Sequence, residues 1–427
     1  MIRMQRASAP VRRGWWISVA CVAGAFASAA SAQISPEAEI SSTYALPVAS
    51  QSAGDAGLPV GRQWSADAVA QLIAVVEGAC AEGLNPADYG LSGLRQAARS
   101  GPSAPLDAAA TASAISLAHD YQFGRVRDRD DMGWMIRRAA DEEAQLPARL
   151  NGAVASGQVG AFLASLLPTD ARYVALRDAL ADAPDATTRD RLRANMERWR
   201  WLPRTMGGSH LYVNVPSYRL QVMDGGVATA TYTVVVGARA TPTPQLITPT
   251  SSLVVNPWWN VPQSIVRSAN LRPGKAGYLF KAGGDGSYAV RQPPGPRNAL
   301  GRIKFVLAND QAIYLHDTPA KVGFRRADRA LSHGCIRVKD IDQLAGQLMS
   351  DAPDPGALDV ALAGTDTATL RLTKTWPVYI VYFTVDSVEP GTIVSYGDPY
   401  GYDARVVARL NGNAAPAIAR PLQIAAR

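Results

Sequence analysis

Cysteine is the scarcest residue in this 427-residue chain, with three copies, and histidine follows with four. The chain also lacks an internal repeat of fixed period and, beyond residue 32, any apolar run long enough to span a membrane. Its formal net charge of +7 falls to +3 once the four arginines of residues 1–32 are set aside. So small an excess of positive charge does not indicate a surface that binds nucleic acid or membranes strongly.

The N-terminus has the features of an export signal. Four arginines precede an apolar stretch that ends in the small-residue sequence ASA. We therefore expect residues 1–32 to be a signal peptide that is cleaved after Ala32. A retained membrane anchor is the alternative, because residues 14–32 almost match the thickness of a bilayer. The adjacent Arg12 and Arg13 leave both the Sec and the twin-arginine export routes open.

Cleavage after Ala32 would remove Cys21 and leave Cys80 and Cys335 in a compartment that permits disulfides. These two thiols then either form a bridge or stay free, and both states remain open. Cys80 follows apolar residues at helical spacing, so we expect it to be a small residue on a packed helix. A free Cys335 beside histidines favours a reactive role instead.

The local composition and hydrophobic periodicity of the sequence divide the chain into segments. Residues 33–62 are rich in Ser, Ala, Pro and Gly, which is typical of a linker. Residues 63–203 are rich in Ala and show helical periodicity broken by Pro and Gly, so we expect a helical scaffold domain. Short runs rich in Val, Tyr and Thr then predict a mostly-β domain over 204–385. A hairpin and tail over 386–427 complete an α+β multidomain chain.

The sequence ALSHGCIRV surrounds Cys335 with the groups that thiol chemistry requires. A thiolate is a nucleophile, and a nearby imidazole can take up its proton; His316 and His333 are both candidates. Gly334 allows the backbone to approach a substrate closely, and adjacent N–H groups can then stabilise an oxyanion. Arg337 alternates with Cys335 along an extended chain, so it lies on the same face and can bind a carboxylate.

Two structural alternatives compete with this interpretation. His316, His333 and Cys335 could be zinc ligands, although a structural zinc site needs a fourth ligand from elsewhere in the chain. Cys335 could also be an inert buried thiol between two satisfied histidines.

The wider sequence resembles a known family. HDTP (316–319) followed by SHGCIRV (332–338) resembles the signature of L,D-transpeptidases with a YkuD-type catalytic domain. Further segments resemble the large multidomain Gram-negative members of that family: ERWRWLP (197–203), VNVPSYRLQV (213–222), VVVG (234–237), NPWWNVPQSI (256–265), PPGPRNALGRIKF (293–305) and AIYLHDTP (312–319).

The resemblance implies roles for the residues around the thiol. Cys335 corresponds to the nucleophile and His316 to the residue that takes and returns its proton. His333 matches a position near the oxyanion region and ranks second as base. Gly334 and the Cys335 amide would stabilise the oxyanion, and Arg337 matches the motif arginine that binds substrate.

Supporting positions follow from the same resemblance. Asp317 is a candidate for orienting His316, and Ser332, the first residue of the SHGCIRV motif, is a candidate supporting residue. Trp258 and Trp259 either line the groove that binds glycan or stem peptide or belong to the core.

The resemblance also implies an activity. Such enzymes attack the third-residue carbonyl of a peptidoglycan tetrapeptide, release D-alanine and pass the acyl group to another stem, which gives a 3→3 cross-link. With water as acceptor the enzyme is an L,D-carboxypeptidase, and with a protein it is an attachment enzyme. No metal or cofactor is implied, carbapenem-type β-lactams are implied as inhibitors, and the location would be the periplasm. A non-catalytic wall-binding scaffold is less favoured, because the cysteine and the histidine are both present.

The sequence departs from the large members in two places, one that concerns substrate selection and one that concerns retention at the cell wall. Residues 266–292, where the large members carry a capping insertion, are short and rich in Gly, so we expect a short lid loop. The helical domain has no room for the small peptidoglycan-binding module that relatives often insert before ERWRWLP.

Overall fold

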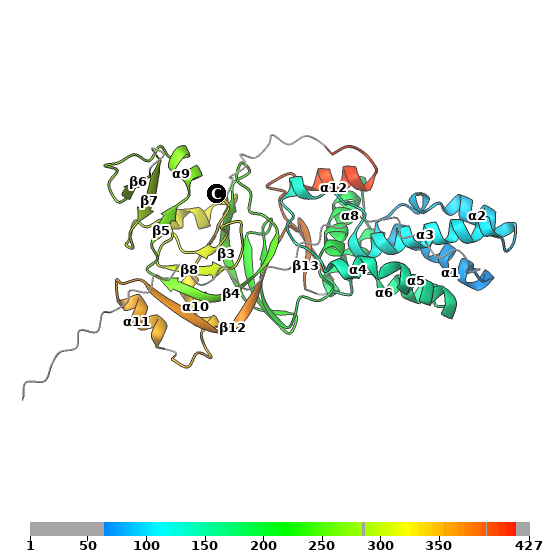
Figure 1. Cartoon of the computed structure of the whole chain (residues 1–427), viewed down its shortest axis with the longest axis horizontal. Helices are drawn as coiled ribbons and strands as arrows, with labels where there is room; N and C mark the ends of the chain where they lie inside the picture. The colour runs from blue at the N-terminus through cyan, green and yellow to red at the C-terminus, as the bar shows by residue number, and fades with distance from the viewer. Residues whose placement is uncertain (1–63, 284–286, 355, 390, 416–427) are drawn as a thin grey trace, which may run out of the picture. The chain divides into compact units, whose positions relative to one another are not determined.

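The computed structural model describes residues 64–283, 287–354, 356–389 and 391–415 (Figure 1). The expected signal peptide (1–32) and linker (33–62) lie outside the described residues. The predicted α+β class is confirmed, with a helical part followed by a mostly-β part. Within the described ranges, no helix is both long and apolar enough to cross a membrane.

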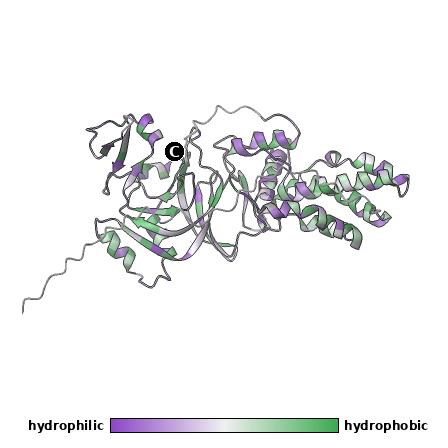
Figure 2. Cartoon of the chain, viewed as in Figure 1, coloured by the Kyte–Doolittle hydropathy of each residue, from purple (hydrophilic) through white to green (hydrophobic). Residues whose placement is uncertain are grey.

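The helical part begins at helices whose first turns are capped by side chains. Ser65, Ser103 and Asp185 each accept a hydrogen bond from the backbone N–H three residues later. The helices carry mixed hydrophobic and hydrophilic residues along their length (Figure 2), and their apolar residues form a continuous core. The elements are α1 (Ala66–Glu77), η1 (Gly78–Glu82), η2 (Pro86–Tyr89), α2 (Leu91–Arg99), α3 (Ala104–Phe123), η3 (Asp130–Met132), α4 (Ala140–Ala144), α5 (Leu146–Ser156), α6 (Val159–Ser165), α7 (Ala171–Ala181) and α8 (Ala186–Trp201).

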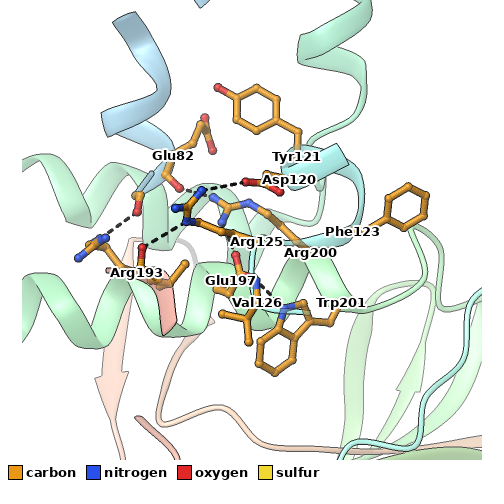
Figure 3. A network of polar contacts seen from close by, with 12 residues as sticks. Glu82, Asp120, Tyr121, Phe123, Arg125, Val126, Arg193, Glu197, Arg200 and Trp201 are labelled. Atoms are coloured by element: carbon orange, nitrogen blue, oxygen red, sulfur yellow. Dashed lines mark hydrogen bonds and ion pairs between the residues drawn. The ribbon is translucent and has the colours of Figure 1, made fainter. Parts of the chain in front are cut away.

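Helix α8 is buried on both sides although its C-terminal half is strongly charged. Towards α3, the Glu197 carboxylate accepts hydrogen bonds from the Val126 N–H (2.8 Å), the Trp201 indole (2.9 Å) and the Arg200 guanidinium (2.9 Å) (Figure 3). Gly124 is required beside it, because a Cβ there would lie 2.6 Å from both Glu197 and Trp201. The buried carboxylate is therefore fully hydrogen-bonded.

The opposite side of α8 contacts segments that follow the main sheet in sequence. Arg198 donates to Asp403 (2.6 Å), and the Asn195 side chain donates to the Thr384 hydroxyl (2.9 Å). Arg198 is 1% exposed, so this ion pair lies in the interior. Helix α8 thus joins the helical part to the end of the β part through buried polar contacts.

The β part is built on one nine-stranded sheet. The strand order is β10-β3-β11-β9-β8-β4-β12-β1-β2, and β2 also pairs with β3, so the strands from β3 to β2 form a closed ring. Its strands are β1 (Ser209–Asn214), β2 (Arg219–Asp224), β3 (Val227–Gly237), β4 (Leu246–Val255), β8 (Ile303–Leu307), β9 (Leu315–His316), β10 (Ala330–Ser332), β11 (Ile336–Val338) and β12 (Ala368–Val381).

Helix α10 (Ile341–Leu348) follows the cysteine motif and packs its apolar residues into the core. A hairpin of β13 (Val385–Glu389) and β14 (Thr392–Ser395) follows the sheet. Two short helices were not predicted, α11 (Ala357–Ala363) and α12 (Asp403–Leu410).

Residues 266–292, expected as a short lid loop, instead contribute to a small folded region. Its three-stranded sheet has the order β5-β7-β6, with β5 (Trp259–Val261), β6 (Leu279–Ala282), β7 (Tyr288–Gln292) and the neighbouring helix α9 (Gln263–Ser268). Trp259, Val266, Val290 and Leu300 form a separate hydrophobic cluster beneath it. The abundant glycines concealed this sheet in the sequence, because its strands are only three to five residues long.

Candidate active site

Two short strands of the main sheet bring the predicted residues together. Strands β9 and β11 pair in parallel, with Leu315 opposite Ile336 and His316 opposite Arg337. Leu315 and Ile336 are fully buried in the core. Because side chains alternate along a strand, His316, Arg337 and Cys335 emerge on the other face of the sheet.

Cys335 is a free, half-buried thiol immediately before β11. Its S–H donates to the Ala312 carbonyl (3.4 Å), and the Tyr314 hydroxyl donates a hydrogen bond to its sulfur. Burial raises the pKa of the thiol, and the hydrogen bonds from Tyr314 partly oppose this effect. Burial therefore favours the neutral thiol of Cys335 over the thiolate.

His316 is 5% exposed, and its orientation is defined by one contact. Its Nδ1 lies 2.5 Å from the Asp317 carbonyl oxygen, an acceptor, so the proton is on Nδ1 and Nε2 can act as a base. Burial and the positive charges of Arg337 and Lys304 lower the pKa of His316 to about 3. The imidazole is therefore neutral at physiological pH.

Asp317, the candidate for orienting His316, contacts the imidazole through its backbone carbonyl and not through its carboxylate. The carboxylate accepts a hydrogen bond from the Arg302 N–H (2.9 Å) and contacts the Lys321 ammonium. A Cβ at Gly301 would lie 2.2 Å from that carboxylate, so only glycine fits there. Asp317 thereby fixes the 295–302 loop next to β9.

The turn before Cys335 is held by Ser332, which is 3% exposed. Its hydroxyl donates to the Cys335 carbonyl (2.5 Å) and accepts from the Gly334 N–H (3.1 Å). Gly334 has a φ of 115°, which glycine adopts readily. Because its N–H is already bonded, Gly334 does not offer the free oxyanion donor that we expected; the Cys335 N–H remains as the candidate.

Two further residues support this turn. The Thr243 hydroxyl accepts from the Gly237 N–H (2.8 Å) and donates to the Gly334 carbonyl (2.7 Å). The Tyr400 hydroxyl accepts from the Thr243 N–H (3.1 Å) and donates to the Gly237 carbonyl (2.7 Å). Sequence analysis missed both, because they are far from Cys335 along the chain and belong to no recognisable motif.

Comparison with protein families identifies residues 208–380 with the L,D-transpeptidase catalytic domain and residues 61–180 with the Scaffold domain. Residues 208–380 belong to the L,D-transpeptidase catalytic-domain family. This range includes both strands that carry the cysteine and the histidine.

A Haemophilus influenzae protein that is provisionally named an L,D-transpeptidase is 31% identical over 324 residues. The match covers 67% of this chain, and the chain spans 65% of that relative's length. Among solved structures, Mycobacterium tuberculosis L,D-transpeptidase 1 is 13% identical, with 41% of this chain and 62% of that chain covered and a TM-score of 0.21. The ertapenem-acylated catalytic domain of the E. faecium L,D-transpeptidase is 16% identical, with 41% and 98% covered and a TM-score of 0.21.

Positive charge surrounds the thiol of the transpeptidase domain. Lys304 lies opposite His316 on β8, and its ammonium is 4.4 Å from the centroid of the Tyr314 ring. Arg337 lies opposite His316 on the other side and is half-buried. His333 is exposed on the turn, and partial burial together with Arg337 lowers its pKa.

The two tryptophans of the transpeptidase domain separate in the structure. Trp259 is 9% exposed and belongs to the hydrophobic cluster under β5, so it is a core residue. Trp258 is 36% exposed, and the Arg291 guanidinium lies 4.7 Å from its ring centroid. Only Trp258 is therefore accessible to a ligand.

Cys80 and Cys335 are not bonded to each other, since both are free thiols. Cys80 is exposed in η1, which differs from the packed position that we expected; its S–H donates to the Glu77 carbonyl (3.5 Å). Among the described residues, no group of three His, Cys, Asp or Glu side chains lies close enough to bind a metal ion.

Proposed function

We propose that the chain is a cysteine-dependent L,D-transpeptidase that forms 3→3 cross-links between peptidoglycan stem peptides. The observation that carries this proposal is the placement of Cys335 and His316 on one face of two adjacent parallel strands, within a domain of this family. A thiol and a neutral imidazole on one face are the pair that acyl transfer needs.

In the first half-reaction, the Cys335 sulfur attacks the carbonyl of the third residue of a tetrapeptide stem. Nε2 of His316 takes the thiol proton as the C–S bond forms, since both groups are neutral before attack. The Cys335 N–H donates to the oxyanion, and the exposed His333 lies beside it. The C–N bond then breaks, the proton of His316 passes to the leaving amine, and D-alanine departs from a thioester.

In the second half-reaction, the side-chain amine of another stem attacks the thioester. His316 takes one proton from this amine and returns it to the departing sulfur, so the thiol is regenerated and an amide cross-link remains. Attack by water would give a shortened stem instead. The same residues serve both outcomes, so the accessible acceptor decides the product.

Recognition of the donor rests on its carboxylates. Arg337 is half-buried next to the thiol, and its Nε is buried without a partner among the described residues. A substrate carboxylate at this guanidinium would satisfy that donor and bring the scissile carbonyl towards Cys335. Lys304 adds positive charge on the other side of His316.

This function requires export, so we propose that residues 1–32 direct the chain to the periplasm, where peptidoglycan is found. The same thiol would accept the acyl group of a carbapenem-type β-lactam, because the strained lactam carbonyl replaces the peptide carbonyl as electrophile. The expected product is one covalent adduct per chain, on Cys335.

Mass spectrometry of the reaction products tests the proposal. The chain lacking residues 1–32 is incubated with purified disaccharide-tetrapeptide, with Cys335→Ala as the inactive variant and Cys80→Ser as the matched thiol control. A dimer that has lost one D-alanine, formed by the parent and by Cys80→Ser but not by Cys335→Ala, is the expected result.

Other products would change the assignment. A tripeptide monomer that depends on Cys335 would mean L,D-carboxypeptidase activity, and a protein-linked stem would mean protein attachment. Undiminished turnover by Cys335→Ala would refute the cysteine mechanism.

A further inference from the structure

The small region around β5, β6 and β7 carries an excess of positive charge. Residues 256–300 contain six of the 43 basic residues of the chain but only one of its 36 acidic residues. All six basic side chains are exposed: Arg267, Arg272, Lys275, Lys281, Arg291 and Arg297. The positive charge of this segment is therefore concentrated at its surface.

These six basic side chains differ in their ion pairing from most arginines of the helical part. There, Arg95, Arg125 and Arg172 each form an ion pair with a neighbouring carboxylate. By contrast, none of the six basic residues of 256–300 forms an ion pair with any described residue. Unbalanced positive charge attracts an anionic partner and is costly to assemble without one.

The register of the three-stranded sheet sorts its side chains onto two faces. Val261, Phe280 and Val290 face the hydrophobic cluster below. Because side chains alternate, Lys281 and Arg291 lie on the opposite, exposed face. We call this exposed face, with Leu279, Lys281 and Arg291, the outer face of the sheet.

Apolar surface accompanies these cations. Leu279 is 55% exposed and lies opposite Arg291 in the strand pairing. Trp258 is 36% exposed, with its ring against the Arg291 guanidinium. An aromatic ring and an aliphatic side chain beside fixed cations suit a ligand that combines flat apolar faces with carboxylates.

We propose that the outer face of this sheet, together with the exposed Arg272 and Lys275 of the segment between α9 and β6, docks the peptidoglycan polymer itself as an anionic glycan–peptide strand. This inference rests on the proposed function. Sugar rings would pack on Trp258 and Leu279, and stem-peptide carboxylates would lie near the cations. Repeated carboxylates along one strand engage several cations at once, so the polymer binds more tightly than a single disaccharide-peptide.

The docking face connects to the thiol through the core of the same region. Tyr314, which donates its hydroxyl hydrogen bond to Cys335, packs against the cluster that supports the sheet. A glycan–peptide polymer that binds the outer face is therefore bound by the same folded region that packs next to the Cys335 thiol. Docking raises the local concentration of stems without contributing to the chemical step.

Co-sedimentation with isolated peptidoglycan sacculi tests the docking face. All binding variants carry Cys335→Ala, so that no covalent adduct forms. We expect Arg272→Glu with Lys281→Glu to weaken sacculus binding about tenfold at low salt. Arg99→Glu with Arg137→Glu makes the same change of net charge at exposed positions of the helical part, and we expect less than about a twofold loss.

The polymer provides a second control. Sacculi whose carboxylates have been converted to amides should bind the parent chain about tenfold more weakly, and salt at about 0.5 M should weaken binding to untreated sacculi. Arg272→Lys with Lys281→Arg should retain binding, because it keeps the charges. A thermal unfolding curve for each variant establishes that it is folded.

The turnover of soluble disaccharide-tetrapeptide separates this inference from the proposed function. With Cys335 intact, the charge-reversed variant should turn over this small substrate at the parent rate. Equal binding by the charge-reversed and parent chains, equal losses in the Arg99/Arg137 control, or no effect of amidation would each overturn the docking face. If sacculus binding follows the predicted pattern while no chain shows turnover, the docking face stands and the transpeptidase proposal fails.

Discussion

Replacing Thr243 by valine removes one hydroxyl group and preserves the shape of the side chain. That hydroxyl accepts from the Gly237 N–H at 2.8 Å and donates to the Gly334 carbonyl at 2.7 Å. All three residues are buried, so water does not replace the lost partner. An unsatisfied buried group costs about 1–3 kcal/mol, so the two groups together should cost about 2–6 kcal/mol.

Thr243→Val should also slow the reaction of Cys335. The Gly334 carbonyl immediately precedes Cys335, so loss of its hydrogen bond lets the turn and the thiol shift together. A displacement of about 1 Å at a reacting atom can cost about a hundredfold in rate. We therefore expect Cys335 to be acylated about a hundredfold more slowly by a carbapenem or by the tetrapeptide.

Urea unfolding and the time course of covalent adduct formation measure the two effects separately. Thr248→Val is the matched control, because this buried hydroxyl donates one hydrogen bond, to the Ala308 carbonyl (2.8 Å), away from the turn. It should lower stability by about 1–3 kcal/mol and leave acylation unchanged. Parent-like acylation by folded Thr243→Val would refute the positioning role.

Three further predictions concern the pH dependence of the rate, the pH dependence of stability and the buried ion pair. Because the pKa of His316 is lowered to about 3, the rate of Cys335 acylation should show no inflection near pH 6.5, and a pH–rate profile with such an inflection would contradict a neutral imidazole. The unfolded imidazole binds its proton near pH 6.5, so the free energy of unfolding should fall as the pH is lowered below that value; His316→Gln should reduce this slope. Arg198→Met leaves Asp403 without its buried partner and should cost about 3–5 kcal/mol in urea unfolding, whereas Arg198→Met with Asp403→Asn should cost less.

The periodicity and motifs of the sequence were sufficient for the fold class and for the candidate pair. Apolar repeats predicted the helices up to α8, and Val-rich runs predicted most strands of the main sheet, because both signals lie within short stretches. Cys335 and His316 stood out because each lies in a contiguous motif. The short strands around 279–292 escaped prediction, since glycines interrupt an apolar pattern of only a few residues.

The contacts at the site that were not predicted join residues that are distant in the sequence but close in space. The alternation of Arg337 with Cys335 was readable from the sequence, but the register of β9 against β11 was not, so the contact of Tyr314 with the thiol was unforeseen. The sequence also assigned an oxyanion role to the Gly334 N–H, which the structure shows donating to Ser332.

The order of a helical and a mostly-β part, and the chemical types around Cys335, could be read from the sequence alone, since both depend on local periodicity and on neighbours along the chain. Tertiary structure decided which of these groups meet. Thr243 and Tyr400 reach the turn at Cys335 only because the sheet and the end of the chain fold onto each other. Burial likewise set the protonation states of His316 and Cys335, because desolvation depends on the packed surroundings and not on adjacent residues.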